Sequence, residues 1–588
     1  MSLELLSFQM RKIRANHARV RAGAWPGSVR IRFTPGRRNP GITIPAPGGG
    51  WDLTGCTAID LDVRNLGVRE GAIVCQAGPH PWTDGIAVLA PGARATVRVL
   101  LKRQAWPPEL RKRFPGMNGA PGDFVWLWDT PDPARVPSLV LYAVAEAAPR
   151  EIEISRLRAV RVHALPEPDP LGPAIFPLAD AYGQYRHREW PGKIHADRDL
   201  REAGRREAAD LRRFPGPARR TRWGGWAAGP RLEATGHFRT AKVTGRWWLV
   251  DPAGALFWSH GITCVNTRES TRVRDRERFF EALPRRGPLA AFGNRDSFDF
   301  HGANLRRKYG AGWLAAARSL AHRRLRSWGL NTIANWSDAA IASMRRTPYC
   351  ATVRYSGRRN AGGFPDMADA ACRGALRAGC RELAKTTAND PWCIGWFIDN
   401  ELSWPKVPDL ARLADTYYRV CRDEMKAVAP CKLYLGSRIH MHYWPFEGEP
   451  EVVRAAARWC DVVSFNRYRF TAADLRLLPG DDKPIIVGEW HFGALDRGML
   501  HTGLRSVGTQ AQRGDTYAFY MRGALANPAI VGAHWFQYHD QCLTGRFDAE
   551  NYQIGFLDIC DTPYPETIAA ARAAGYDLYR FRSGSRRK

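Results

Sequence analysis

The alternation of apolar runs with helical segments is the feature of this sequence that most limits its fold. From about Gly236 onwards, eight short apolar runs are separated by segments with helical periodicity, such as 311–328 and 409–429. This alternation is typical of a parallel sheet covered by helices. It predicts an α/β fold, a (β/α)8 TIM barrel with insertions, because that barrel typically has about 250 residues and eight such units. The predicted strands are 256–263, 331–336, 350–355, 393–401, 433–439, 462–468, 485–491 and 530–538.

The first part of the chain has a different pattern. Short segments such as 59–64 alternate apolar and charged residues and are separated by Pro- and Gly-rich turns, which predicts an N-terminal β-sandwich. We expect the sandwich at 1–162, a Pro-rich linker and barrel-embracing segment at 163–235, the barrel at 236–578 and a basic tail at 579–588. The predicted loops of the sandwich carry several tryptophans. Contact with a glycan and packing against the barrel are equally good explanations of their presence: Trp51, Trp82, Trp106, Trp126 and Trp128.

The formal net charge of +29 raises the question of a nucleic-acid partner. Most of the 87 basic residues are Arg, they are spread along the whole chain, and no zinc-finger spacing or RNP-type motif accompanies them, so we expect no nucleic-acid binding. Only the run from Arg580 to Lys588 is compact, and it predicts a disordered tail. Because Arg suits bidentate contact with sulfate groups, a sulfated polysaccharide stays open as a partner.

Cysteine and histidine usage indicates neither a disulfide framework nor a metal site. The 12 Cys include no CxxC pair. His440 and His442 have no carboxylate beside them, so we assign no metal ligands and no cofactor. The first 20 residues lack the apolar core of a signal peptide, and no stretch is long enough to span a membrane. We therefore expect no membrane partner and a cytoplasmic location for the chain as given, with a periplasmic or secreted one if a leader was removed; the oligomeric state stays open.

The ends of the predicted barrel strands carry polar and acidic side chains. Active sites of such barrels lie at the C-terminal ends of the strands. Glu401 ends the fourth strand after Asn400, and Glu489 ends the seventh after Gly488. Two opposed carboxylates are what acetal hydrolysis requires, and a separation of about 5–5.5 Å predicts retention of configuration. The alternative, that one of them is an ordinary ion-pair partner of an Arg, is disfavoured because both stand at strand ends.

Several segments of the sequence resemble those of a known family. Residues 182–193, 245–252, 257–261, 399–404 and 488–498 resemble glycoside hydrolase family 50, the β-agarases, within a clan of retaining barrel glycosidases. The resemblance runs from about residue 170 to the end, and the segment around Glu489 is its most specific part. Members of the family often carry an N-terminal sandwich that resembles a carbohydrate-binding module, which agrees with the pattern of residues 1–162.

The resemblance implies roles for individual residues. Glu401 would be the acid/base and Glu489 the nucleophile, with Asn400 bonded to the sugar hydroxyl next to the anomeric carbon. By the same resemblance, Tyr468 would steady the nucleophile and Trp535 would form the floor of the −1 subsite. His260 and His491 would line the same pocket. Each His has the alternative of a hydrogen-bonded group behind the pocket. Asn335 and Trp336 are added for their position at a strand end.

The implied activity is hydrolysis of β-1,4-galactosidic bonds in agarose or neoagaro-oligosaccharides. The same mechanism on a sulfated galactan such as porphyran, or on a β-galactoside, is the first alternative. A non-catalytic glycan-binding protein is the alternative of another class. The intact Asn-Glu and Gly-Glu elements argue against it. Endo and exo action are not distinguished, because they depend on the loops around the cleft.

Overall fold

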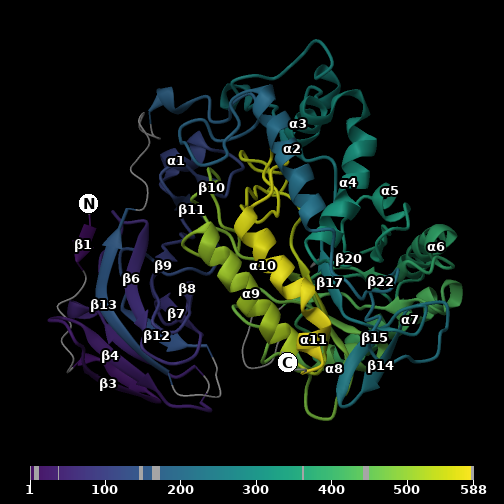
Figure 1. Cartoon of the computed structure of the whole chain (residues 1–588), viewed down its shortest axis with the longest axis horizontal. Helices are drawn as coiled ribbons and strands as arrows, with labels where there is room; N and C mark the ends of the chain where they lie inside the picture. The colour runs from purple at the N-terminus through teal and green to yellow at the C-terminus, as the bar shows by residue number, and fades with distance from the viewer. Residues whose placement is uncertain are drawn as a thin grey trace.

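The computed structural model describes residues 2–4, 12–37, 39–144, 150–161, 172–359, 363–440 and 449–584. It confirms the predicted fold class, with an N-terminal β-sandwich beside a parallel α/β barrel (Figure 1). In the view of Figure 1 the purple and blue sandwich lies to the left of the barrel, and helix α9 (Gln510–Ala526) runs between them.

Two antiparallel sheets form the sandwich. One has the order β3-β4-β13-β6-β9, with β1 paired to β13, and the other has the order β2-β5-β12-β7-β8. Along β6 (Ala58–Asn65), Ile59, Leu61 and Val63 point into the core between the sheets, and their neighbours point outwards. The other strands of the sandwich are β1 (Ser2–Glu4), β2 (Arg14–Asn16), β3 (Ala18–Ala22), β4 (Val29–Phe33), β5 (Gly41–Pro45), β7 (Gly71–Ala77), β8 (Thr83–Leu89), β9 (Arg94–Leu100), β12 (Ser138–Ala143) and β13 (Arg150–Val160).

The barrel sheet contains nine strands in the order β23-β22-β21-β20-β17-β27-β26-β25-β24. All its pairs are parallel, as the sequence pattern predicts. The strands are β17 (Ser259–Ile262), β20 (Thr332–Ile333), β21 (Tyr349–Val353), β22 (Cys393–Ile398), β23 (Leu433–Tyr434), β24 (Ile439–His440), β25 (Val463–Asn466), β26 (Ile485–Trp490) and β27 (Ile530–Trp535).

The predicted fifth strand is present as two short pieces. β23 pairs with β22, and β24 pairs with β25, so the barrel closes through the segment that joins them. Within that segment Gly436 has φ 76° and Arg438 has φ 55°. Left-handed backbone is uncommon for a residue other than glycine. This left-handed backbone turns the chain between β23, which pairs with β22, and β24, which pairs with β25.

Helices surround this sheet. Helices α4 (Trp313–Ser327), α6 (Ala370–Thr387), α7 (Leu410–Val428), α8 (Pro450–Trp459), α9 and α10 (Pro565–Tyr576) follow barrel strands, whereas α5 (Ala339–Ala342) is a single turn. The segment before the barrel contributes α2 (Asp197–Arg213), which lies over α3 (Phe300–Tyr309) (Figure 1). Its Glu207 is held by Arg324 of α4, whose guanidinium also bonds Asp561. None of the described helices is long and apolar enough to cross a membrane.

The sandwich is fastened to a loop of the barrel that follows strand β26. Lys102 donates to the carbonyl oxygens of Gly503 and Leu504 at 3.1 and 3.0 Å. The Arg505 guanidinium binds both carboxylate oxygens of Asp84 at 3.0 and 2.9 Å. Because β26 carries Glu489, the sandwich supports the loop next to a candidate catalytic residue.

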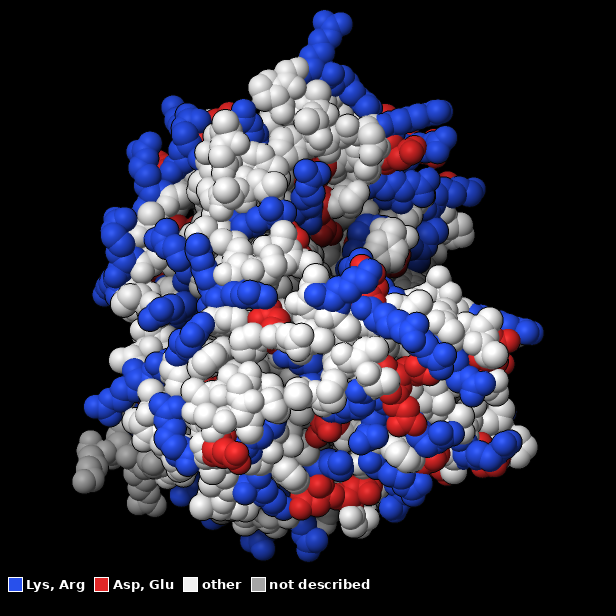
Figure 2. All heavy atoms as spheres, turned by 90° about the vertical axis from the view of Figure 1, so that its right-hand side faces the viewer, with Lys and Arg blue, Asp and Glu red and all other residues white. Residues whose placement is uncertain are grey.

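The expectation of a disordered basic tail is wrong for its first residues. Helix α11 (Leu578–Arg582) continues the fold, and Arg582 is fully buried, donating to the carbonyl oxygens of Leu525, Trp247 and Pro528. Those carbonyls at the end of helix α9 and beside it accept hydrogen bonds from both terminal nitrogens of the guanidinium, which offsets the cost of burying a basic residue here. Elsewhere the basic residues are dispersed: Figure 2 shows Lys and Arg interleaved with Asp and Glu over one face rather than gathered in a stripe.

Candidate active site

The turn after strand β22 places Glu401. Asp399 and Glu401 have φ values of 60° and 49°, a left-handed backbone that costs about 1–2 kcal/mol per residue outside glycine. Asp399 holds the turn, because its carboxylate accepts hydrogen bonds from Tyr355 at 2.6 Å and Tyr417 at 2.8 Å. The Asp-Asn-Glu segment therefore works as an anchor followed by two residues that face the barrel mouth.

Glu489 accepts hydrogen bonds from three side chains of different strand ends. The Trp336 indole donates to Oε1 at 3.2 Å, and the Arg438 guanidinium donates to the same oxygen. The Tyr468 hydroxyl donates to Oε2 at 2.5 Å. Glu489 is 5% exposed and Arg438 is fully buried. A carboxylate bound by a buried guanidinium and two further donors is held in one orientation.

Glu401 has a different environment. Its Oε1 accepts a hydrogen bond from Asn466 at 2.6 Å. Removal from water raises the pKa of Glu401 to about 7, and the negative charge of Glu489 acts in the same direction, while Asn466 and Arg438 oppose the shift. Near neutral pH the group is therefore able both to give and to accept a proton, as a general acid and base must.

Arg438 and Asn466 connect the two carboxylates. Arg438 binds Glu489 through one nitrogen, and its Nε donates to Asn466 Oδ1 at 3.2 Å. The Asn466 amide in turn donates to Glu401 and to Asn400 Oδ1, the latter at 3.2 Å. The structure thus brings Glu401 and Glu489 to one mouth, at the two ends of a hydrogen-bonded bridge, which we call the Arg438–Asn466 bridge.

Gly488 leaves the space that this bridge occupies. A Cβ atom at position 488 would lie 2.9 Å from Asn466 Oδ1 and 3.1 Å from Arg438 Nε. Cβ atoms essentially never approach a neighbour that closely, so the bridge and a side chain at 488 exclude each other. The Gly-Glu pair at the end of strand seven thus has a steric reason in addition to the chemistry of Glu489.

Three of the other predicted residues lie at or directly behind this mouth. Trp336 contacts Glu489 and carries the Arg438 guanidinium 5.3 Å from its ring centroid. Asn335 is buried beneath, donating to Thr352 at 3.0 Å. The His491 ring packs at an angle against that of Tyr468, with ring centroids 4.7 Å apart, and its Nε2 accepts a hydrogen bond from the Leu504 backbone at 2.8 Å. Burial holds the pKa of His491 well below its usual value, so it is a neutral group behind Tyr468.

His260 and Trp535 lie elsewhere, contrary to the expectation that they line the pocket. Both ring nitrogens of His260 are engaged, with the Gly329 carbonyl at 3.0 Å and the Tyr517 hydroxyl at 2.7 Å. Trp535 is fully buried, and its indole donates to the Ile554 carbonyl at 2.7 Å. Its ring lies 5.3 Å from Tyr517 of helix α9. Both side chains therefore pack between the sheet and helix α9.

Strand alternation explains these positions. Successive side chains of a strand point to opposite faces. Ser259 and His534 face the barrel interior, where Ser259 Oγ lies 2.8 Å from His534 Nε2. Their neighbours His260 and Trp535 must then point outwards, to the helices. Of the two histidines considered as metal ligands, His440 lies 6.4 Å from the Tyr468 ring, and His442 is outside the described residues.

Comparisons with known proteins agree with this geometry. No family model matches the chain. It is similar to solved structures titled as an agarase, AgWH50C (27% identity, TM-score 0.77, 97% of this chain and 98% of the other), and as an exo-beta-agarase (26%, 0.78, 98% of each). PfGH50B gives 25% identity and a TM-score of 0.78 over 97% of this chain and 98% of the other. These likenesses support the assignment to glycoside hydrolase family 50.

Two curated relatives are also named as agarases. Beta-agarase B of Vibrio sp. (strain JT0107) is 28% identical over 89% of this chain, and Beta-agarase A of the same organism is 27% identical over 69%. This chain spans 66% of the length of the first relative and 52% of the second.

The structure adds site residues that the sequence left without a role. Arg438 and Asn466 stand at predicted strand ends, but only their pairing in space shows what they hold. Phe536, one residue after Trp535, belongs to an apolar cluster with Trp336 and Tyr552 and so lies on the site side of the strand. Alternation of side chains along the strand could have found Phe536, because it lies two residues after His534, which faces the barrel interior.

A loop beside the site presents an aromatic ring to solvent. Phe547 is 93% exposed. The preceding residue, Arg546, lies with its guanidinium 6.0 Å from the Phe536 ring and 5.3 Å from the Phe547 ring, and it bonds Glu550 at 2.6 Å. The charge of Glu550 acts on the pKa of Glu401, which places this loop at the mouth. Among the described residues no group of three or more His, Cys, Asp or Glu is arranged to hold a metal ion.

Proposed function

We propose that this chain is a retaining glycoside hydrolase that cleaves β-1,4-galactosidic bonds of agarose or neoagaro-oligosaccharides. The observation that carries the proposal is the contrast between its two facing carboxylates: Glu489 is fixed by three donors, while removal from water raises the pKa of Glu401 to about 7. In glycosidases, different environments of the two carboxyl groups keep one protonated as the acid and the other ionised. Relatives and neighbours named as agarases supply the substrate class.

In the first step Glu401 acts as an acid. Its proton goes to the glycosidic oxygen as the bond from that oxygen to the anomeric carbon breaks, and the ionised Glu489 forms a bond to the anomeric carbon. Tyr468 and Arg438 hold the attacking carboxylate in one orientation. Fixing the nucleophile in this way removes orientational freedom that the reaction would otherwise have to overcome.

In the second step Glu401 acts as a base. It takes a proton from water while the water oxygen bonds to the anomeric carbon and the ester to Glu489 breaks. Because the ester carries no negative charge, one of the causes that raise the Glu401 pKa is then gone. Asn400 is oriented for the sugar, since its Oδ1 already accepts from Asn466 and its amide N–H groups are left to donate to a hydroxyl.

A neutral galactan suits this mouth better than a sulfated one. The two arginines placed there are committed to carboxylates, Arg438 to Glu489 and Arg546 to Asp548 and Glu550. The mouth also offers aromatic faces: Trp336 and Phe536 form its wall, and Phe547 lies exposed beside it. Aromatic rings of this kind pack well against the apolar face of a galactose ring.

Product analysis tests the proposal. Agarose, porphyran and neoagarotetraose are incubated with the protein, and the anomer first released is followed by ¹H NMR. We expect neoagaro-oligosaccharides from agarose, released first as the β-anomer. The α-anomer first would replace retention by inversion, and porphyran cleaved in preference to agarose would change the substrate. No cleavage of any of the three would leave a non-catalytic glycan-binding protein.

The assignment of roles has its own test. Glu489→Ala removes the nucleophile, so turnover should fall to background, and azide should restore it with inverted product. Glu401→Ala should retain activity on aryl glycosides with good leaving groups, which need little protonation. Equal loss in both variants on such a substrate would show that the roles are assigned wrongly.

A further inference from the structure

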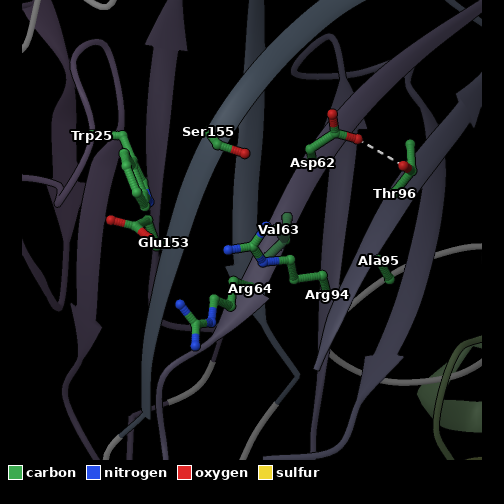
Figure 3. A pocket seen from close by; sticks show the side chains of 9 residues that line it. All are labelled: Trp25, Asp62, Val63, Arg64, Arg94, Ala95, Thr96, Glu153 and Ser155. Atoms are coloured by element: carbon green, nitrogen blue, oxygen red, sulfur yellow. Dashed lines mark hydrogen bonds between the residues drawn. The ribbon is translucent and has the colours of Figure 1, made fainter. Parts of the chain in front are cut away.

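A second pocket lies on the outer face of the sandwich, on a different domain from the catalytic mouth. Its volume is about 350 Å³, and it opens over strands β6, β9 and β13 (Figure 3). Trp25 stands on one side of it, and Arg64 and Arg94 lie on neighbouring strands across from Trp25. Its size falls at the lower end of the range of small-molecule sites, about 300–1,000 Å³.

Trp25 is exposed although the turn that carries it is firmly held. The indole is 62% exposed. Residues 25–28 form a β-turn closed by the Ser28 N–H to Trp25 carbonyl bond at 2.9 Å, with Gly27 at φ 77°, as a type II turn requires. The buried Glu153 fixes the turn from below, accepting from the Ala24 N–H at 2.7 Å. The rigid turn holds a large aromatic face in water, where a sugar ring can pack against it.

The outward side chains of β6 and β9 form three successive pairs. Asp60 lies opposite Arg98 and accepts its guanidinium at 2.7 and 2.8 Å. Asp62 lies opposite Thr96 and accepts its hydroxyl at 2.6 Å. The third pair is Arg64 opposite Arg94, two like charges on directly facing positions.

The third pair lacks the complement that the first two have. Like charges directly opposite each other in a sheet are destabilising. Within the described part of the chain, neither Arg64 nor Arg94 forms an ion pair, and the Nε of Arg64 is a buried donor without a hydrogen-bond partner. Both guanidinium groups line the pocket that Trp25 borders. An anion between them would supply the missing partner.

We propose that this pocket binds a sulfated galactose residue of a galactan chain, with the sugar ring on Trp25 and the sulfate between Arg64 and Arg94. Planar guanidinium groups bind sulfate oxygens in bidentate fashion, and an indole accepts the apolar face of the ring. The choice of a galactan rests on the proposed function. The site is for binding only, because its carboxylates are already occupied, Asp62 by Thr96 and Arg158, and Glu153 by Ala24 and Ser28.

Such a site would give the two domains complementary tasks. The catalytic mouth suits neutral galactose, because its arginines are paired. Natural galactans carry sulfate on some units, and the sandwich would hold those units while neutral stretches of the same chain reach the mouth. Linking two sites on one chain raises the effective concentration of the polymer at the mouth without new contacts there.

The test measures binding by calorimetry on the full chain carrying Glu489→Gln, which suppresses hydrolysis. The probes are a sulfated porphyran hexasaccharide, neoagarohexaose and inorganic sulfate. We expect Arg64→Gln with Arg94→Gln to weaken binding of the sulfated hexasaccharide at least tenfold and to leave binding of neoagarohexaose unchanged. Trp25→Ala should weaken the sulfated hexasaccharide similarly, while inorganic sulfate should bind far more weakly than the sugar.

Matched controls separate the site from general charge and from folding. Arg32→Gln removes one positive charge from the outer face of the same sheet away from the pocket and is compared with Arg64→Gln and Arg94→Gln made singly, and Trp128→Ala removes another exposed indole of the sandwich. Neither should change binding. Equal losses from Arg32→Gln and from the pocket variants, wild-type affinity in the pocket variants, or sulfate binding as tightly as the sugar would each overturn the proposal.

A parallel assay keeps the two proposals apart. With Glu489 intact, the pocket variants should cleave neoagarotetraose at the wild-type rate, because this short neutral substrate does not need the sandwich site. If no galactan is cleaved but sulfated hexasaccharide binding depends on Arg64 and Arg94, only the proposed function fails. Cleavage of agarose together with binding that ignores the pocket variants would remove the second site alone.

Discussion

Arg505 joins the sandwich to Tyr468, the residue whose hydroxyl donates to Glu489. The Arg505 Nε donates to the Tyr468 carbonyl at 2.6 Å, while its Nη1 binds the Asp84 carboxylate of strand β8. The backbone of Leu504, the residue before Arg505, donates to His491, whose ring packs at an angle against the Tyr468 ring. The sandwich therefore supports Glu489, the proposed nucleophile, through the main chain and the ring of one tyrosine.

This connection predicts that Asp84 affects catalysis from outside the barrel. Asp84→Ala should release Arg505 and let Tyr468 shift, so that kcat falls about tenfold or more while KM changes little, since a small misplacement of a catalytic group is costly. Asp84→Asn, which can still accept one hydrogen bond, should restore part of the loss. Steady-state kinetics on neoagarotetraose measures both.

A second ion pair between the same domains serves as the control. Glu70 of the sandwich pairs with Arg522 of helix α9, away from Tyr468. Glu70→Gln should leave kcat unchanged. If it lowers kcat as much as Asp84→Ala does, the effect comes from loosened docking of the domains, and the Arg505–Tyr468 contact is not its cause.

The Arg438–Asn466 bridge predicts a severe effect of a single methyl group. Gly488→Ala would place a Cβ atom 2.9 Å from Asn466 Oδ1 and so displace the bridge. We expect kcat to fall at least tenfold. Because the hydrogen bond from Asn466 holds the pKa of Glu401 down, its loss should also move the alkaline limb of the pH–rate profile upwards. Gly374→Ala in helix α6, where a Cβ meets open space, is the control and should preserve kcat. An unshifted pH profile in the Gly488 variant would contradict the role of the bridge.

The strands of the barrel were predictable because each is an apolar run between helices, and their ends located Glu401, Glu489, Trp336 and Tyr468. The directions of side chains within those runs were not. Strands β26 and β27 are buried at every position, so hydrophobicity does not alternate along them and gives no sign that Trp535 faces the helices. The roles of Arg438 and Asn466 depend on two strands meeting in space, and Arg582 of the helix at the basic end is held by carbonyls at and beyond the end of helix α9.

The raised pKa of Glu401 predicts a pH-dependent cost in stability. In the unfolded chain the group titrates near 4.5, and in the folded chain its pKa is raised to about 7. The folded state thus holds the extra proton between these values, and stability falls as pH rises through that window. Glu401→Gln has no such penalty. Its melting temperature relative to wild type should be steady below about pH 4.5, rise between pH 4.5 and 7, and level off above. A difference independent of pH would show that the two states share one pKa.

The last prediction concerns how one residue serves as acid and then as base. Removal from water and the charge of Glu489 are the two largest of the causes that raise the pKa of Glu401, while Arg438 acts against them. Glu489→Gln imitates the neutral ester of the intermediate, because it removes the negative charge and keeps the shape. It also leaves the Arg438 charge without its carboxylate, so that the guanidinium favours an ionised Glu401 more strongly.

We therefore expect the pKa of Glu401 to be lower in Glu489→Gln than in wild type, though still above 4.5 because the group stays removed from water. Glu550→Gln is a graded control: its charge acts on Glu401 in the same direction but ranks below that of Glu489, so its variant should shift the pKa less. Infrared or ¹³C NMR titration of the carboxyl group in the three proteins measures the order. An unchanged or raised value in Glu489→Gln would mean that burial alone sets the pKa. Forming the ester would then not turn the acid into a base, and the proton cycle would need a movement of the protein to drive it.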